Sequence, residues 1–61
     1  MEKINMTLAR KLKPGDKVNG HELGWMTVKF IENRFPVHVL YDTPYGDEWK
    51  TYLPDDWVET L

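Results

Sequence analysis

The residue types that carry out covalent chemistry are scarce in this chain. It has no Cys and no Ser, which removes the two commonest nucleophiles. His21 is next to Glu22, but adjacent residues of a strand point to opposite faces of a sheet. The other histidine, His38, lies far along the sequence, and no spacing of His with acids is typical of a metal site. We therefore expect a protein that is not an enzyme and has no catalytic residue, metal or cofactor.

Acidic side chains gather in the second half of the chain. Two neighbouring carboxylates can transfer protons when burial raises the pKa of one of them. Here the acids fall in segments with Pro and Gly, where Asp stabilises turns through its side chain. We interpret them as turn residues that also offer an acidic rim to a basic partner. These acids are Asp42, Asp47, Glu48, Asp55 and Asp56.

Basic side chains dominate the first half. Residues 1–30 hold six Lys and Arg against three acids, whereas residues 31–61 hold two against seven. Basic residues beside an exposed aromatic ring, here Trp25 or Phe35, are typical of sites for single-stranded nucleic acid. The net charge of −2 is less basic than is usual for such proteins, so nucleic acid is the alternative partner. The basic candidates are Lys11, Lys13, Lys17, Lys29 and Arg34.

Aromatic residues are numerous, with three Trp, three Tyr and two Phe. Large aromatic side chains can build a core from few residues, whereas an exposed Trp is often the main contact of a protein interface. We assign Phe30, Tyr41 and Trp49 to the core and Trp57 to a binding surface. The predicted partner-binding residues are Trp57, Pro54, Tyr45 and Trp25, with Asp55 and Asp56 at the rim.

The chain is short enough to be one domain, residues 1–61. A domain of this size buries only about 60% of its unfolded surface, and without Cys it has no disulfide to stabilise it. No apolar run reaches the roughly 18 residues of a membrane span. The start of the chain does not read as a signal peptide. We expect a cytoplasmic protein without a membrane partner.

Short strands separated by turns position these residues. One or two helical turns are predicted over residues 7–13, capped by Asn5 or Thr7. A strand is the rival there, because alternate residues from Ile4 to Leu8 are apolar. A 3₁₀ turn is predicted at 54–56. Strands are predicted over residues 17–19, 25–32, 37–42, 48–53 and 58–61.

The alternation of side chains assigns faces to these strands. In residues 25–32, Met26, Val28 and Phe30 fall on the predicted core face. In residues 48–53, the predicted core face carries Trp49 and Leu53. Trp25 then lies away from the core.

The closing segment, residues 53–61, reads Leu-Pro-Asp-Asp-Trp-Val-Glu-Thr-Leu. It resembles the end of SH3 domains, where Leu-Pro or Phe-Pro, two small polar residues and Tyr-Val precede a short last strand. The resemblance implies that Pro54 and Trp57 line a peptide groove and that Val58 belongs to the core.

Two bacterial families are similar in outline. Gly-Asp-Lys-Val at 15–18, followed by Met-Thr-Val at 26–28, resembles the YodC-like group. The opening segment, residues 7–16, resembles the start of FeoA-type SH3-like domains. Together these resemblances imply a small prokaryotic or phage SH3-like barrel, and they imply no chemistry.

These observations predict a mainly all-β protein. We expect a small five-stranded SH3-like antiparallel barrel, with a short N-terminal helical turn and a 3₁₀ turn before the last strand. The expected function is protein–protein binding, as in a phage or mobile-element accessory protein that binds or inhibits a host protein. Nucleic-acid binding through the basic N-terminal segment is the alternative, and a small enzyme that works as an oligomer is a third hypothesis.

Overall fold

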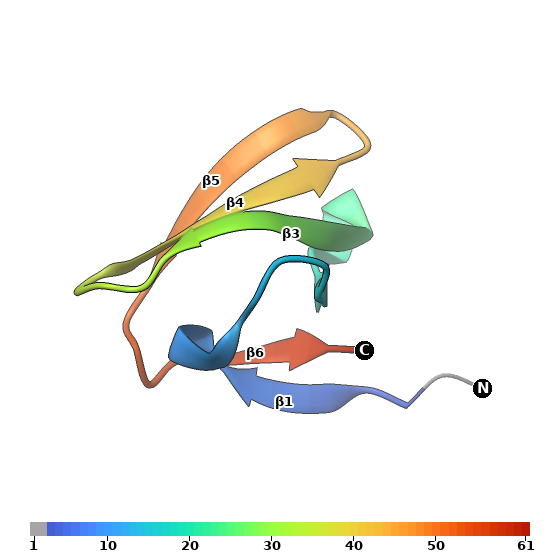
Figure 1. Cartoon of the computed structure of the whole chain (residues 1–61). Coiled ribbons are helices and arrows are strands. Elements are labelled where there is room, and N and C mark those ends of the chain that lie inside the picture. The colour runs from blue at the N-terminus through green and yellow to red at the C-terminus, as the bar shows by residue number, and fades with distance from the viewer. Residues whose placement is uncertain (1–2) are drawn as a thin grey trace.

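Alternating apolar residues and turns with Pro or Gly divide the chain into six strands (Figure 1). The computed structural model describes residues 3–61. Two single 3₁₀ turns, η1 and η2, join the first three strands. The strands are β1 (Asn5–Leu8), β2 (Lys17–Asn19), β3 (Trp25–Glu32), β4 (Val37–Thr43), β5 (Gly46–Tyr52) and β6 (Trp57–Thr60), and the turns are η1 (Ala9–Lys11) and η2 (His21–Leu23).

All six strands belong to one antiparallel sheet in the order β1-β6-β2-β3-β4-β5. The sheet is bent, so that β3, β4 and β5 lie on one side of the molecule and β6 and β1 on the other (Figure 1). Strands β1 and β5 are its two edges. The prediction of an all-β protein is confirmed, whereas the sheet has six strands instead of five and is not closed.

The N-terminal segment differs from its prediction. The alternative prediction, a strand, is confirmed by β1. This strand pairs with β6, with Asn5 opposite Thr60 and Leu8 opposite Trp57. The predicted helix over residues 7–13 is reduced to the single turn η1, whose preceding residue makes no side-chain cap. A helix this short is unstable by itself, and pairing with β6 satisfies the backbone of residues 5–8 instead.

The predicted 3₁₀ helix before the last strand is also wrong. Residues 53–56 form a simple β-turn, closed by a hydrogen bond of 3.0 Å from the Asp56 N–H to the Leu53 carbonyl. The side chain of Leu53, predicted in the core, is exposed at this corner because it follows the end of β5.

The core lies on the inner face of the bent sheet. Tyr41 and Val58 belong to it, as predicted. The hydroxyl groups of Tyr41 and Tyr52 share a hydrogen bond of 2.8 Å. The cluster consists of Leu12, Val18, Met26, Val28, Val37, Val39, Tyr41 and Val58.

A β-bulge in β3 reverses one of the predicted faces. Val28 pairs with Tyr41 and Phe30 pairs with Leu40, so Lys29 is the extra residue between them. Because one inserted residue exchanges the two faces of a strand, Phe30 turns outward and Ile31 packs against the core. The prediction that Phe30 lies in the core is therefore wrong.

Strand β5 presents the opposite face from the one predicted. Trp49 pairs with Leu40, which faces outward because its neighbours Val39 and Tyr41 are buried. The indole of Trp49 is therefore on the outer face and 51% exposed. Lys50 and Tyr52 take the inner face in its place.

Candidate functional site

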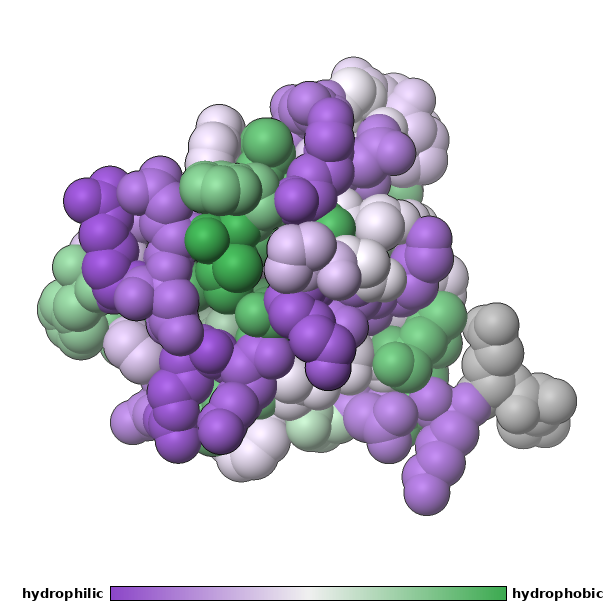
Figure 2. Space-filling view, in the orientation of Figure 1, coloured by the Kyte–Doolittle hydropathy of each residue, from purple (hydrophilic) through white to green (hydrophobic). Residues whose placement is uncertain are grey.

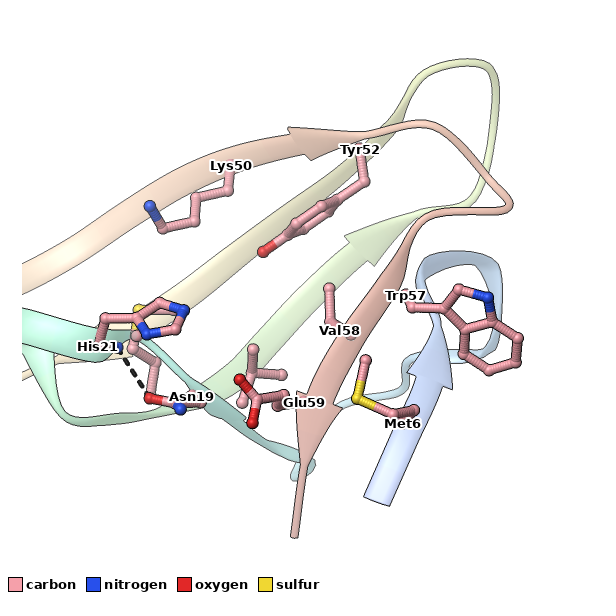
Figure 3. Close-up of a pocket in the computed structure, with 11 residues that line it drawn as sticks. Met6, Asn19, His21, Lys50, Tyr52, Trp57, Val58 and Glu59 are labelled. Atoms are coloured by element: carbon pink, nitrogen blue, oxygen red, sulfur yellow. Dashed lines mark hydrogen bonds between the residues drawn. The ribbon is translucent and has the colours of Figure 1, made fainter. Parts of the chain in front are cut away.

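A groove lies between β5 on one side and β6 with β1 on the other (Figure 3). Its volume is about 360 Å³. The core residues Val18, Met26 and Val58 contribute its apolar lining. The groove therefore joins the two halves of the bent sheet, and its remaining lining residues come from β1, β2, β5, β6 and the loop that contains η2.

The β6 side of the groove carries an exposed aromatic ring. Trp57 and Glu59 are alternate residues of β6, so both side chains leave the strand on the face opposite to buried Val58. Met6 of β1 is paired with Glu59 and also lines the groove. Trp57 is 61% exposed, and its indole lies at the end of the groove opposite to His21 (Figure 3). Exposed Trp beside a groove is typical of a protein-binding surface.

The β5 side carries a cation and a tyrosine. Lys50 and Tyr52 lie on the inner face, opposite Val39 and Val37 of β4. Burial raises the pKa of Tyr52, although its hydrogen bond with Tyr41 acts in the other direction. Burial is also the main reason why the pKa of Tyr41 is raised, and the hydrogen bond with Tyr52 adds to it. The two hydroxyl groups are therefore neutral at physiological pH.

The loop that contains η2 lies at one end of the groove and is held in shape by its own hydrogen bonds. The backbone N–H of Gly20 donates to the Gly24 carbonyl at 2.8 Å, and the N–H of His21 donates to the Asn19 side chain at 2.8 Å. His21 has a positive φ of 55°, a conformation in which His is enriched among residues other than Gly. These bonds place the imidazole of His21 at the rim (Figure 3).

Opposite charges stand on the two walls. Lys50 extends from β5 and Glu59 from β6, and both side chains are directed toward the groove (Figure 3). Neither takes part in an ion pair within residues 3–61, where the pairs are Arg10–Asp55, Lys29–Asp47 and Arg34–Glu32. A ligand that carries both signs of charge would find an opposite charge on each wall.

The structure separates the predicted partner-binding residues into two groups. Pro54, Asp55 and Asp56 form the turn that leads into Trp57. Tyr45 lies in the turn between β4 and β5, at the other end of β5. Seven residues of strand, about 20 Å at full extension, separate that turn from residue 53.

Trp25 belongs with the second group. It begins β3, where it pairs with Asn19, and two residues later Thr27 pairs with Asp42 near the end of β4. Its indole is partly exposed at that end of the sheet. Trp25 and Tyr45 therefore lie away from the groove end that Trp57 occupies.

Three of the predicted acids stabilise local structure. The Asp56 carboxylate accepts a hydrogen bond of 2.9 Å from the Leu53 N–H, and Asp55 pairs with Arg10. The Asp47 carboxylate lies 2.8 Å from the Lys29 ammonium, and this contact raises the pKa of Lys29. The interpretation as turn residues therefore holds for Asp55 and Asp56. It is wrong for the other three acids, because Asp42 lies in β4 and Asp47 and Glu48 lie in β5.

The predicted basic residues are spread over the chain. Lys29 and Arg34 are in ion pairs, and the Lys17 ammonium donates to the Thr27 hydroxyl at 2.7 Å. Lys11 lies in η1 and Lys13 precedes the turn into β2, both exposed. Two of the five cations are therefore already paired with carboxylates, which lowers the charge available for phosphate groups.

Sequence reasoning missed most of the groove. Its residues Met6, His21, Lys50 and Glu59 are brought together by the bend of the sheet, and no local spacing connects them. One pattern was informative: Glu48, Lys50 and Tyr52 alternate along β5, so they must share a face. That face was assigned to solvent because Trp49, on the other side of the strand, is more hydrophobic.

The surface shown in Figure 2 is mostly hydrophilic, and hydrophobic residues appear on it in separate places bordered by hydrophilic ones. Within residues 3–61, no group of three or more His, Asp or Glu is placed to hold a metal ion. The same residues include no helix long and apolar enough to cross a membrane. No protein-family model, curated protein or solved structure matches this chain.

Proposed function

We propose that the protein is a non-enzymatic binding module that holds an extended segment of another protein in the groove. The observation that carries this proposal is the exposed ring of Trp57 at the end of a groove whose walls carry the charges of Lys50 and Glu59, which have no ion-pair partner within residues 3–61. Trp is enriched among the residues that dominate protein interfaces. Charged groups on the walls would orient the bound segment and select its sequence.

An extended segment fits this groove better than a compact small molecule. The volume of about 360 Å³ is at the lower end of the range for small-molecule pockets, and the groove is open at its rim. The two charges lie on opposite walls, so a single small charged group would meet attraction from one wall and repulsion from the other. A peptide with an acidic and a basic side chain satisfies both walls.

Truncation of Trp57 to Ala tests this proposal. Because the indole is 61% exposed and the adjacent Val58 supplies the core contact, we expect the variant to fold. The partner is captured from a cell lysate with the wild-type protein, identified by mass spectrometry and produced in pure form. Titration calorimetry should then show at least a tenfold loss of affinity for the variant.

Tyr45→Ala is the matched control, because Tyr45 is 81% exposed and lies at the other end of β5. We expect this variant to bind the partner as the wild type does. The proposal fails if Trp57→Ala binds with wild-type affinity, or if both variants lose affinity equally. NMR titration with the isolated partner segment supplies a second readout: shifts should concentrate at Met6, His21, Lys50, Tyr52 and Glu59.

A further inference from the structure

Strand β5 is a free edge of the sheet over its full length. It is the last strand in the order β1-β6-β2-β3-β4-β5 and pairs only with β4 among the described strands. In an antiparallel ladder, alternate residues of an edge strand direct their N–H and C=O groups away from the neighbouring strand. Such a row of unpaired backbone groups is a template for another strand. Five of the seven residues of β5 are exposed, and only Lys50 and Tyr52 are partly buried.

An apolar band on the outer face leads to this edge. Phe30 pairs with Leu40, and Leu40 pairs with Trp49 on β5, so the three side chains form a row across β3, β4 and β5. The rings of Phe30 and Trp49 meet edge to face, with centroids 6.2 Å apart and an interplanar angle of 86°. Both rings are about half exposed, at 52% and 51%. We call this row the outer band, and exposed apolar surface of this kind marks interaction sites.

The inner face of the same strand carries two opposite charges. Glu48 and Lys50 flank Trp49 on either side in the sequence and point to the face opposite to the indole. Neither side chain takes part in an ion pair within residues 3–61. The edge therefore presents an acid and a base of the same chain at positions symmetric about Trp49.

We propose that β5 pairs antiparallel with β5 of a second copy of this chain, about a two-fold axis at Trp49. In this register Glu48 of each copy lies opposite Lys50 of the other. Trp49 lies opposite Trp49 of the second copy, so the two outer bands join into one. Two-fold contacts require a surface that is complementary to itself, and this arrangement of charges is self-complementary.

The charges also select the register. An axis one residue earlier places Glu48 opposite Glu48 of the second copy, and an axis one residue later places Lys50 opposite Lys50. Like charges directly opposite one another in a sheet are destabilising. Among these neighbouring registers, only the axis at Trp49 pairs opposite charges.

A charge-exchange series tests the proposal by sedimentation equilibrium over protein concentrations from about 10 µM to 1 mM at low salt, where ion pairs are least screened. The wild type should show a monomer–dimer equilibrium. Glu48→Lys and Lys50→Glu should each weaken dimerisation at least tenfold, because each places like charges opposite one another. The double variant Glu48→Lys/Lys50→Glu restores opposite charges and should recover the wild-type dimer affinity.

Glu22→Lys is the matched control, because it makes the same change of net charge on exposed η2. It should dimerise as the wild type does. Trp49→Ala should weaken the dimer, and its circular dichroism establishes whether it is folded. A wild type that stays monomeric at 1 mM overturns the proposal, as does a double variant that dimerises no better than the single variants. Lys50 belongs both to this edge and to the groove, but the groove proposal is tested separately with Trp57→Ala, because Trp57 lies on β6.

Discussion

Gly20 is the one glycine of the four at which an added Cβ atom would collide with neighbouring atoms. Its φ of −96° is open to any L-residue, so its backbone conformation does not require glycine. The restriction is steric: a Cβ atom there would lie 2.7 Å from the Gly24 carbonyl oxygen and 2.9 Å from the Met26 sulfur. Met26 is part of the apolar lining of the groove, so this contact links the η2 loop to the groove itself.

We expect Gly20→Ala to lower the free energy of unfolding by about 1 to 3 kcal/mol, the usual cost of overpacking. The Gly24 oxygen belongs to the backbone and cannot rotate away, so the loop must shift as a unit. Urea unfolding at constant pH measures the loss. Glu22→Ala, an exposed change in the same loop, should stay within about 0.5 kcal/mol of the wild type. Equal stability of the two variants would contradict the steric argument.

At the scale of single residues, hydrophobicity alone predicted exposure poorly. Tyr41 and Val58 were placed correctly, because their strands alternate without interruption. Phe30 and Trp49 were placed in the core and are half exposed. A large aromatic side chain is favourable in a core, but it is also favourable on a surface that another chain covers, and sequence alone does not separate these two environments.

At the scale of elements, the extent of β3 was predictable and its faces were not. The run from Trp25 to Glu32 is a strand in the structure, as its composition predicts. The bulge at Lys29 then exchanges the two faces of its second half. No residue type marks that position, since Lys is common on exposed strands. The register with β4 decides it, and register depends on the whole hairpin.

The turn between β5 and β6 was recognisable from Pro54 and its two aspartates, and the roles of those aspartates differ. The Asp56 carboxylate accepts a hydrogen bond from the backbone N–H of Leu53, which is a second hydrogen bond across the turn. Asp55 points to solvent, where it pairs with Arg10 of η1. The first contact satisfies a backbone group, whereas the second joins two exposed charges.

We therefore expect Asp56→Ala to cost about 1 kcal/mol of stability, the usual contribution of one such hydrogen bond. Asp55→Ala should cost less than about 0.5 kcal/mol, because exposed ion pairs contribute little. Thermal unfolding of the two variants, measured at equal concentration, gives the comparison. A larger effect at Asp55 than at Asp56 would refute this account of the turn.

At the scale of the whole molecule, the bend of the sheet creates the groove and leaves β1 and β5 as free edges. The order of strands along the chain was predictable, since the sequence marks each turn. The pairing of β6 between β1 and β2 was not, because it joins segments about fifty residues apart. Unless that pairing is known, nothing in the sequence indicates that Met6 and Glu59 lie near Lys50. The groove is thus a property of topology rather than of any motif.

Burial of Tyr41, together with its hydrogen bond to Tyr52, makes the whole fold lose stability at alkaline pH. Tyr41 has no exposed surface and lies on β4, at the centre of the larger half of the sheet. Its pKa is raised, first by burial and then by the hydrogen bond with Tyr52. The folded protein therefore retains the Tyr41 proton at pH values where the unfolded chain, with a pKa of about 10, has lost it.

Because the folded state then binds more protons than the unfolded state, the contribution of Tyr41 to stability is constant below about pH 9 and falls as the pH rises past 10. The slope for Tyr41 approaches about 1.4 kcal/mol per pH unit once the unfolded chain is ionised. Urea unfolding between pH 8 and 11 measures it. The Tyr41→Phe variant should be less stable than the wild type at pH 8, because it lacks the hydrogen bond. Phe cannot ionise, so the stability of the variant should decline less steeply as the pH rises. Parallel pH profiles for this variant and the wild type would show that the alkaline loss arises elsewhere in the molecule.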